Sequence, residues 1–99
     1  MFVALSRFTI ANDMSDSVHA AFRARPHLVE QEPGFLGMQV LSPIESPREI
    51  WLITHWADEA SYRTWHQGHS YHESHAGIPK GLKLVPKDTE IRFFNLIAI

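Results

Sequence analysis

Cysteine is absent from the 99 residues of the chain, and so are long apolar runs and any excess of positive charge. Without cysteine, the chain cannot form a disulfide scaffold, a thiolate zinc site, an iron–sulfur cluster or a cysteine nucleophile. No apolar run approaches the ~18 residues of a membrane-spanning helix. Nine basic residues stand against eleven acidic ones, a formal net charge of −2. This charge disfavours a protein that binds nucleic acid through a general positive field.

What the chain does contain is enough apolar material for one modest core. Apolar residues make up 44% and charged residues 20% of the sequence, which is typical of a folded domain. We therefore expect a single domain over residues 1–99. The first residues lack the basic segment of an export signal, so the expectation is a cytoplasmic protein that binds neither membrane nor nucleic acid.

Strand-like and helix-like segments alternate along the sequence without repeats or linkers. Pro26 removes a backbone donor, so we expect the first helix to break near Arg25. Asn12 or Asp13 offers an N-cap for the first helix and Asp58 one for the second. The predicted elements are strand 2–10, helix 14–30, strand 35–41, strand 48–56, a helix from 58 to 68, a short helix 70–77, a loop over 77–87 and strand 89–99. The order βαββαβ predicts an α+β, ferredoxin-like fold.

The first and last strands carry apolar residues on both of their faces. In the first strand Phe2 and Ala4 alternate with Val3 and Leu5, and the last strand shows the same doubling. Two helices can cover only one face of a four-stranded sheet, so the second apolar face needs another chain. We therefore predict a homodimer that packs sheet against sheet.

Four of the seven histidines (His66, His69, His72 and His75) fall within ten residues. Their spacing of three rotates each side chain by about −60° on a helix, so no more than two would converge on a metal ion. A solvated polar face suits the first three best. His75 lies four residues after Tyr71, so the two share a helix face, which we expect to point toward the sheet. A histidine there is either a hydrogen-bonded core residue or a ligand-binding residue.

Ser6 is a small polar residue on an otherwise apolar strand face. A buried hydroxyl needs a hydrogen-bond partner or lines a cavity. Tryptophan is usually a core residue, and we expect Trp51 and Trp56 in the core. Ser6, Trp65 and His75 could surround one pocket between the sheet and the helices, with the loop 77–87 as its lid.

The sequence resembles the antibiotic biosynthesis monooxygenase family along nearly its whole length. The pair Trp65 and His75 more specifically resembles the small haem-degrading monooxygenases of that family. The motifs that carry the resemblance are Met1-Phe2-Val3 with Arg7, Ala21-Phe22-Arg23-Ala24-Arg25, Glu32-Pro33-Gly34-Phe35, Trp56-Ala57-Asp58-Glu59, and Trp65 with His75-Ala76.

The resemblance implies a dimeric α+β barrel and a set of roles around haem. In this hypothesis His75 binds the haem iron, Trp65 presses on the porphyrin plane, Phe22 lines the pocket and Arg25 pairs with a propionate. The haem-degrading members carry an asparagine where this chain has Ser6. A serine hydroxyl reaches less far into the pocket than that amide. The resemblance therefore implies haem binding through His75 more strongly than it implies haem degradation. Electrons must come from an external reductant, because the chain has no dinucleotide-binding glycine motif.

Other family members act without a cofactor and oxidise electron-rich phenols to quinones. In that alternative His75 is a general base and Trp65 a stacking wall. A third alternative is a non-catalytic dimeric barrel that binds a small hydrophobic ligand, since one scaffold supports several functions.

Overall fold

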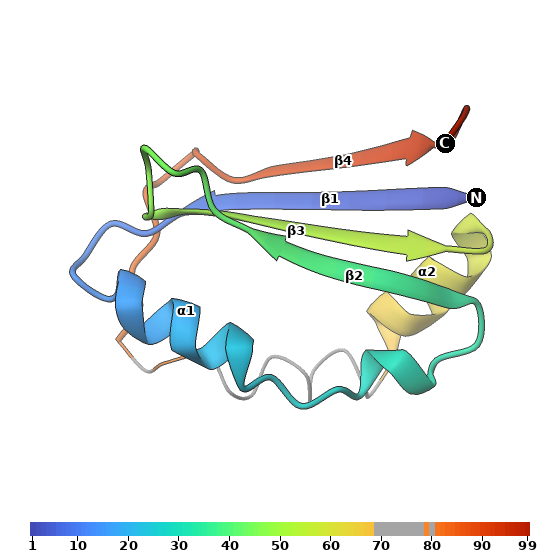
Figure 1. The fold of residues 1–99 in the computed structure, drawn as a ribbon, viewed down its shortest axis with the longest axis horizontal. Helices are drawn as coiled ribbons and strands as arrows, with labels where there is room; N and C mark the ends of the chain where they lie inside the picture. Colours follow the sequence, from blue (N-terminus) through green and yellow to red (C-terminus); the bar gives the residue numbers. More distant parts are fainter. Residues whose placement is uncertain (69–78, 80) are drawn as a thin grey trace.

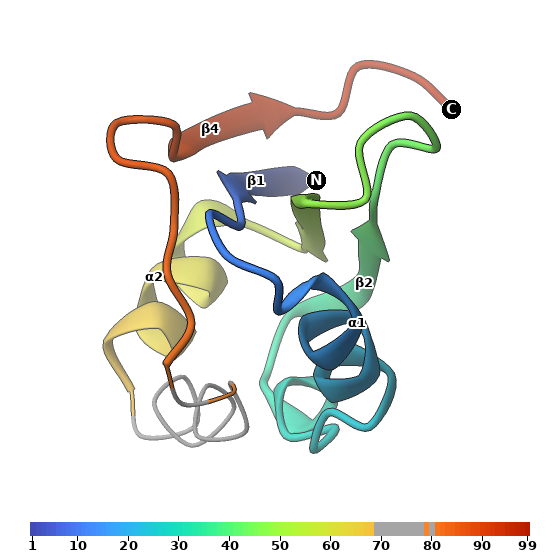
Figure 2. The same ribbon diagram turned by 90° about the vertical axis from the view of Figure 1, so that its left-hand side faces the viewer.

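The computed structural model describes residues 1–68, 79 and 81–99. Two helices lie on one side of a four-stranded antiparallel sheet, and the ends of the chain lie at the same end of that sheet (Figures 1 and 2). The strand order is β2-β3-β1-β4, which confirms the predicted ferredoxin-like fold. The elements are β1 (Phe2–Thr9), α1 (Ser15–Arg23), the 3-10 turn η1 (Val29–Gln31), β2 (Phe35–Leu41), β3 (Glu49–Trp56), α2 (Glu59–Gln67) and β4 (Glu90–Asn95).

The first helix is shorter than the sequence pattern predicts. It ends at Arg23 instead of Glu30, and the chain passes Pro26 before it forms η1. Proline disfavours a helical conformation at the residue before it, which explains the break near Arg25. The predicted cap is wrong, because the N-cap of α1 is Met14 without a side-chain hydrogen bond. Asn12 instead donates to the Gly81 carbonyl at 3.0 Å.

The second helix begins and ends as predicted. The Asp58 carboxylate accepts a hydrogen bond from the Ser61 backbone N–H at 2.8 Å, and α2 ends before Gly68. The turn before β2 packs against this helix start. Gly34 has φ +82°, and a Cβ at that position would lie 2.2 Å from the Ser61 hydroxyl. Only glycine satisfies both conditions, so this turn fixes β2 next to α2. The predicted helix 70–77 lies outside the described residues.

The register of the sheet assigns each strand residue to one face. Ser6 pairs with Leu52 on β3 and with Ile91 on β4. Because alternate residues share a face, these three side chains belong to the side that the helices cover. Arg7 pairs with Trp51 and Glu90 on the opposite side, called the outer face below. Trp51 is therefore half-buried on the outer face, and the prediction that it lies in the core is wrong.

The core fills the space between the covered face and the helices in two clusters. One cluster surrounds the fully buried Trp56, and the other contains Ile10, Val18 and Ile50. Ile10 follows β1 and forms an isolated bridge with Leu84, which ties the segment before β4 to the sheet. The two clusters leave room between them, and that space forms the cavity described below.

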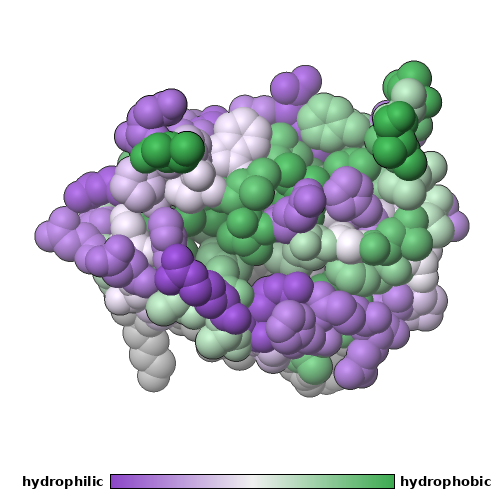
Figure 3. All heavy atoms as spheres, viewed as in Figure 1, coloured by the Kyte–Doolittle hydropathy of each residue, from purple (hydrophilic) through white to green (hydrophobic). Residues whose placement is uncertain are grey.

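The last strand is shorter than predicted and more exposed. β4 ends at Asn95 instead of Ile99, and Ile97 is 91% exposed. On the outer face Phe94 remains 38% exposed and Leu41 49% exposed. The end of the chain forms an apolar patch at the upper right of Figure 3. Among the described residues, no helix has the length and apolar character needed to cross a membrane.

Candidate functional site

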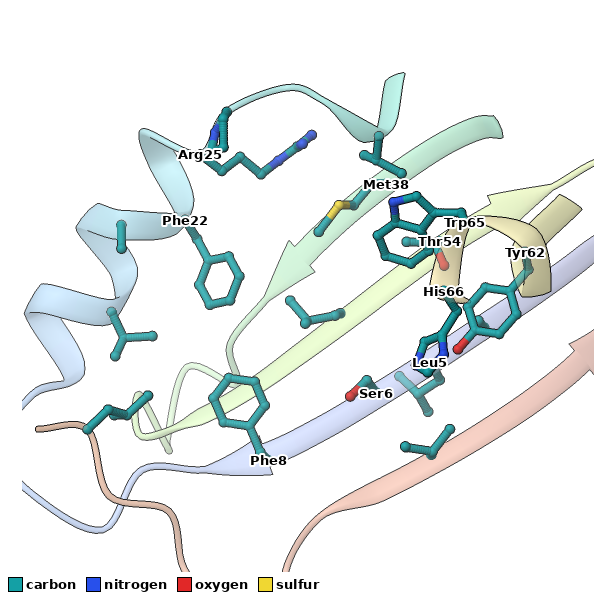
Figure 4. Close-up of a pocket in the computed structure, with 18 of the residues that line it drawn as sticks. Leu5, Ser6, Phe8, Phe22, Arg25, Met38, Thr54, Tyr62, Trp65 and His66 are labelled. Carbon is teal, nitrogen blue, oxygen red and sulfur yellow. The ribbon is translucent and has the colours of Figure 1, made fainter. Parts of the chain in front are cut away.

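A cavity of about 140 Å³ lies between the covered face of the sheet and the helices. Its lining is mainly apolar, with side chains from β1, α1, the α1–η1 connection, β2, β3 and α2 that point toward one shared space (Figure 4). Pro79 and Leu82, from the predicted lid loop 77–87, also contribute to the wall. The predicted residues Ser6, Phe22, Arg25 and Trp65 all line this cavity.

Ser6 brings a hydroxyl to the middle of an apolar wall. It stands between Ala4 and Phe8 on the covered face of β1 (Figure 4). Within the described part of the chain, no hydrogen bond occupies the Ser6 hydroxyl. The hydroxyl is thus available to a polar atom of a ligand. The neighbouring residues on this face of β1 are apolar, so Ser6 interrupts an otherwise apolar row of side chains.

Trp65 forms the aromatic end of the cavity. It is 8% exposed, and its ring lies 5.5 Å from that of Trp56 and 6.2 Å from that of Tyr62. Tyr62 and Trp65 are three residues apart on α2, so both face the sheet. The Tyr62 ring also lies 5.5 Å from the rings of Phe2 and Phe93. This packing holds the indole of Trp65 in place against the cavity.

Arg25 follows α1, three residues after Phe22, and also lines the cavity (Figure 4). Its guanidinium forms two contacts with the Glu30 carboxylate, with Nη2–Oε1 at 2.7 Å and Nη1–Oε2 at 3.4 Å. His27 Nδ1 lies 3.2 Å from Glu30 Oε2. Desolvation acts to raise the pKa of Glu30, but the hydrogen bond from Arg25 and the charges of Arg25 and His27 outweigh it, so this pKa is lowered. Arg25 thus reaches the cavity as one half of an ion pair.

Several lining residues were not predicted from the sequence as site residues. His66 is exposed, as its assignment to a solvated face predicts, and it also lines the cavity, with its ring 5.6 Å from that of Tyr62. Met38, Leu52 and Thr54 line the cavity from β2 and β3. Strand alternation already places these three on the covered face, and the spacing from Trp65 places Tyr62. The sequence did not indicate that the two core clusters leave a cavity between them, so it did not identify these residues as cavity-lining.

His75, the predicted ligand of haem iron, lies outside the described residues, and so do His69 and His72. In the part of the chain that the structure describes, no group of three or more His, Asp or Glu side chains could hold a metal ion. The described wall therefore supplies an indole, a paired guanidinium, an imidazole and the hydroxyls of Ser6, Thr54 and Tyr62 on a mainly apolar surface. Walls of this composition are typical of sites for small apolar molecules.

Comparison with known proteins identifies the family. The model of the antibiotic biosynthesis monooxygenase family matches residues 1–77. The chain belongs to this family. A heme oxygenase (mycobilin-producing) of Mycobacterium tuberculosis is 38% identical over 56 residues, which cover 57% of this chain and 52% of that protein. The match thus spans about half the length of this relative.

Solved structures share the fold over nearly the whole chain. The heme-degrader MhuD from Mycobacterium tuberculosis, with two hemes bound in its active site, superposes with a TM-score of 0.79 at 23% identity and covers 100% of this chain and 98% of its own. SnoaB, a cofactor-independent oxygenase from Streptomyces nogalater, has a TM-score of 0.76 at 15% identity over 99% of this chain and 94% of its own. At these identities the likeness establishes the fold only, which two different oxygenase chemistries share.

Proposed function

We propose that this protein is a monooxygenase that binds haem in the cavity and uses O₂ with an external reductant. The observation that carries the proposal is the combination of Ser6, Trp65 and Arg25 on the wall of one mainly apolar cavity. The relative described as a heme oxygenase supports it from the sequence side.

The chemistry of the wall fits a flat apolar ring with acidic edges. The indole of Trp65 provides an aromatic surface, the aliphatic side chains exclude water, and Arg25 provides a cation for a carboxylate. The cavity volume limits the size of the ligand that can bind. A cavity of about 140 Å³ compares with cavities of ~150 Å³ that hold one benzene ring. Haem is larger, so its binding requires more space than this cavity offers.

Each residue has a defined task in this proposal. His75 would hold the iron, which in bound haem supplies the capacity to bind and reduce O₂. Trp65, backed by Trp56, would press on the face of the ring and keep it from becoming planar. Ser6 would donate a hydrogen bond from its hydroxyl toward the polar atom nearest to β1. Phe22 would exclude water, and Arg25 would pair with a carboxylate of the ligand.

The size of the cavity favours a second candidate function. A single aromatic ring fits the cavity without any widening, as expected for a cofactor-free monooxygenase that oxidises a small phenol. His75 would then accept the phenolic proton as a general base, and Trp65 would stack on the ring. No external reductant is needed in that case, because the ionised phenol itself supplies electrons to O₂.

We also propose that two copies of the chain form a homodimer through their outer faces. Phe94 and Leu41 leave apolar surface exposed there, and Val3 and Ile53 are only partly covered. Two sheets that pack face to face bury such residues from both sides, which removes the cost of their exposure. The result would be the dimeric barrel that the resemblance implies.

Hemin titration of the purified protein, followed at the Soret band, tests the haem proposal. We expect about one hemin per subunit and a histidine-ligated spectrum that His75→Ala abolishes. His19→Ala is the control, since His19 lies outside the cavity and contacts the Pro47 carbonyl at 2.9 Å. Identical spectra of the wild type and His75→Ala would exclude His75 as the ligand. If hemin does not bind, O₂ uptake with small phenols distinguishes the cofactor-free enzyme from a non-catalytic binding protein.

A further inference from the structure

Arg25 is the one guanidinium that lines the cavity within the described part of the chain, and no lysine of that part joins it. Its side chain is 19% exposed, so the charge is largely withdrawn from solvent. A guanidinium binds a carboxylate best through two parallel N–H donors. Whether those donors are free or occupied therefore decides how the cavity treats an anionic ligand.

Both donors of this pair are directed at a carboxylate of the chain itself. The break at Pro26 ends α1 and turns the chain into η1, which places Glu30 beside Arg25. The two residues are five apart, a separation that a continuous helix would not bring into contact. The Glu30 carboxylate is charged at neutral pH even at the ordinary pKa of 4.5, and the pair with Arg25 lowers this pKa further.

We infer that Glu30 determines the charge selectivity of the cavity by competing with anionic ligands for Arg25. This inference deepens the proposed function, because it concerns the ligand of the same site. A ligand carboxylate gains the two-point contact with Arg25 only after it displaces Glu30. A neutral ligand of the same shape has no such requirement. The pair therefore lowers the advantage that an acidic ligand would otherwise gain from the arginine.

The expected change in ligand affinity follows from how exposed the Arg25–Glu30 ion pair is. The Glu30 side chain is 35% exposed, so water weakens its attraction to Arg25. Ion pairs at such sites change binding constants by up to about fivefold. Glu30→Gln removes the competing charge and should tighten binding of an anion by this factor. Binding of the matching neutral molecule should stay the same.

The test uses 4-hydroxybenzoate and 4-hydroxybenzamide, single-ring molecules that differ in one carboxylate. Their binding is measured by NMR chemical-shift titration of the wild type, Glu30→Gln, Arg25→Gln and the double variant. Glu59→Gln is the control for net charge, since Glu59 pairs with Arg63 on α2 at 2.5 Å and does not line the cavity. Circular dichroism verifies that each variant is folded.

Glu30→Gln should tighten binding of the benzoate but not of the benzamide, Glu59→Gln should change neither, and the effect should vanish when Arg25 is Gln. An equal change for both molecules, no change, or no detectable binding of the benzoate to any variant would overturn the inference. A parallel titration with hemin and hemin dimethyl ester separates the two proposals. Absence of hemin binding contradicts the haem function, whereas the single-ring pair still decides the role of Glu30.

Discussion

The two faces of the sheet use the same strands for different purposes. The covered face packs Trp56, Ile50 and Ala4 against the helices and leaves a cavity lined by Ser6 and Trp65. The outer face carries partly exposed apolar residues and a charged cluster. In that cluster, Arg7 lies 3.3 Å from Glu90, 3.5 Å from Asp88 and 3.7 Å from Glu49.

The covered face provides the core and the proposed ligand site, and the outer face provides the proposed interface. The covered face obtains its stability within the chain, because helices bury its apolar side chains. The outer face has no such cover, and its charged cluster interrupts the apolar surface at one end. The Arg7 guanidinium lies 5.9 Å from the centre of the Trp51 ring, whose N–H donates to Glu49 at 2.7 Å. We expect this cluster to fix the register of the two copies, since misplaced charges would be buried without partners.

The largest effect should come from the covered face. Trp56→Ala should lower the free energy of unfolding by about 3–5 kcal/mol, because Trp56 is fully buried and its removal leaves a cavity. Urea denaturation measures this loss. Trp56→Phe should cost clearly less, since the indole N–H has no hydrogen-bond partner among the described residues. Equal losses for both variants would contradict this account of the packing.

On the outer face, a charge should break the dimer while the chain stays folded. Phe94→Asp should weaken association by about 3 kcal/mol, since the symmetric interface loses two aromatic contacts worth ~1.5 kcal/mol or more each. Phe94 is already 38% exposed in the single chain, so far-UV circular dichroism should change little. Ile44→Asp is the control, at a residue 99% exposed in the β2–β3 connection. Sedimentation of the wild type as a monomer at micromolar concentration would contradict the dimer.

Within the cavity, Ser6→Asn should accelerate haem degradation without changing hemin affinity by more than a few-fold. An amide donor extends further from β1 than the hydroxyl, and one well-placed donor typically changes a rate by ~10²-fold. The measurement is decay of the Soret band with ascorbate, air and catalase. Trp65→Ala should slow the decay in either background, because the ring can relax to planarity. If neither substitution affects the decay, the cavity is not built for haem.

The smallest effect should be the response to acid, and both faces should contribute to it. The hydrogen bond from Thr9, followed by the Arg7 charge, lowers the pKa of Asp88, and hydrogen bonds from Ser61 lower that of Asp58. A carboxyl with a lowered pKa stabilises the fold above its ordinary value of 3.8 and loses this contribution as the pH falls through its folded value. Asp58→Asn and Asp88→Asn should therefore destabilise more at pH 7 than at pH 2, as measured by urea denaturation at both pH values. A loss that is the same at both pH values would contradict this.

The order of the elements, the fold and the face of Ser6 could be predicted from the sequence. Alternation along β1 assigns Ser6 to the covered face, Asp58 caps α2, and Pro26 ends the first helix region. These features depend on residues that are neighbours in the chain, so local periodicity and local hydrogen bonding decide them. The family resemblance then named Ser6, Phe22, Arg25, Trp65 and His75, although their roles and the site of His75 stay predictions.

Only the tertiary structure decided which of these groups meet and in what state. The sequence by itself predicted a helix break near Arg25 and placed His66 on the second helix. The tertiary structure paired Arg25 with Glu30 across the break at Pro26, brought His66 to the cavity and left Trp51 on the outer face. The physical reason is that periodicity fixes the direction of a side chain relative to its own element. The distance to another element depends on how all of them pack together.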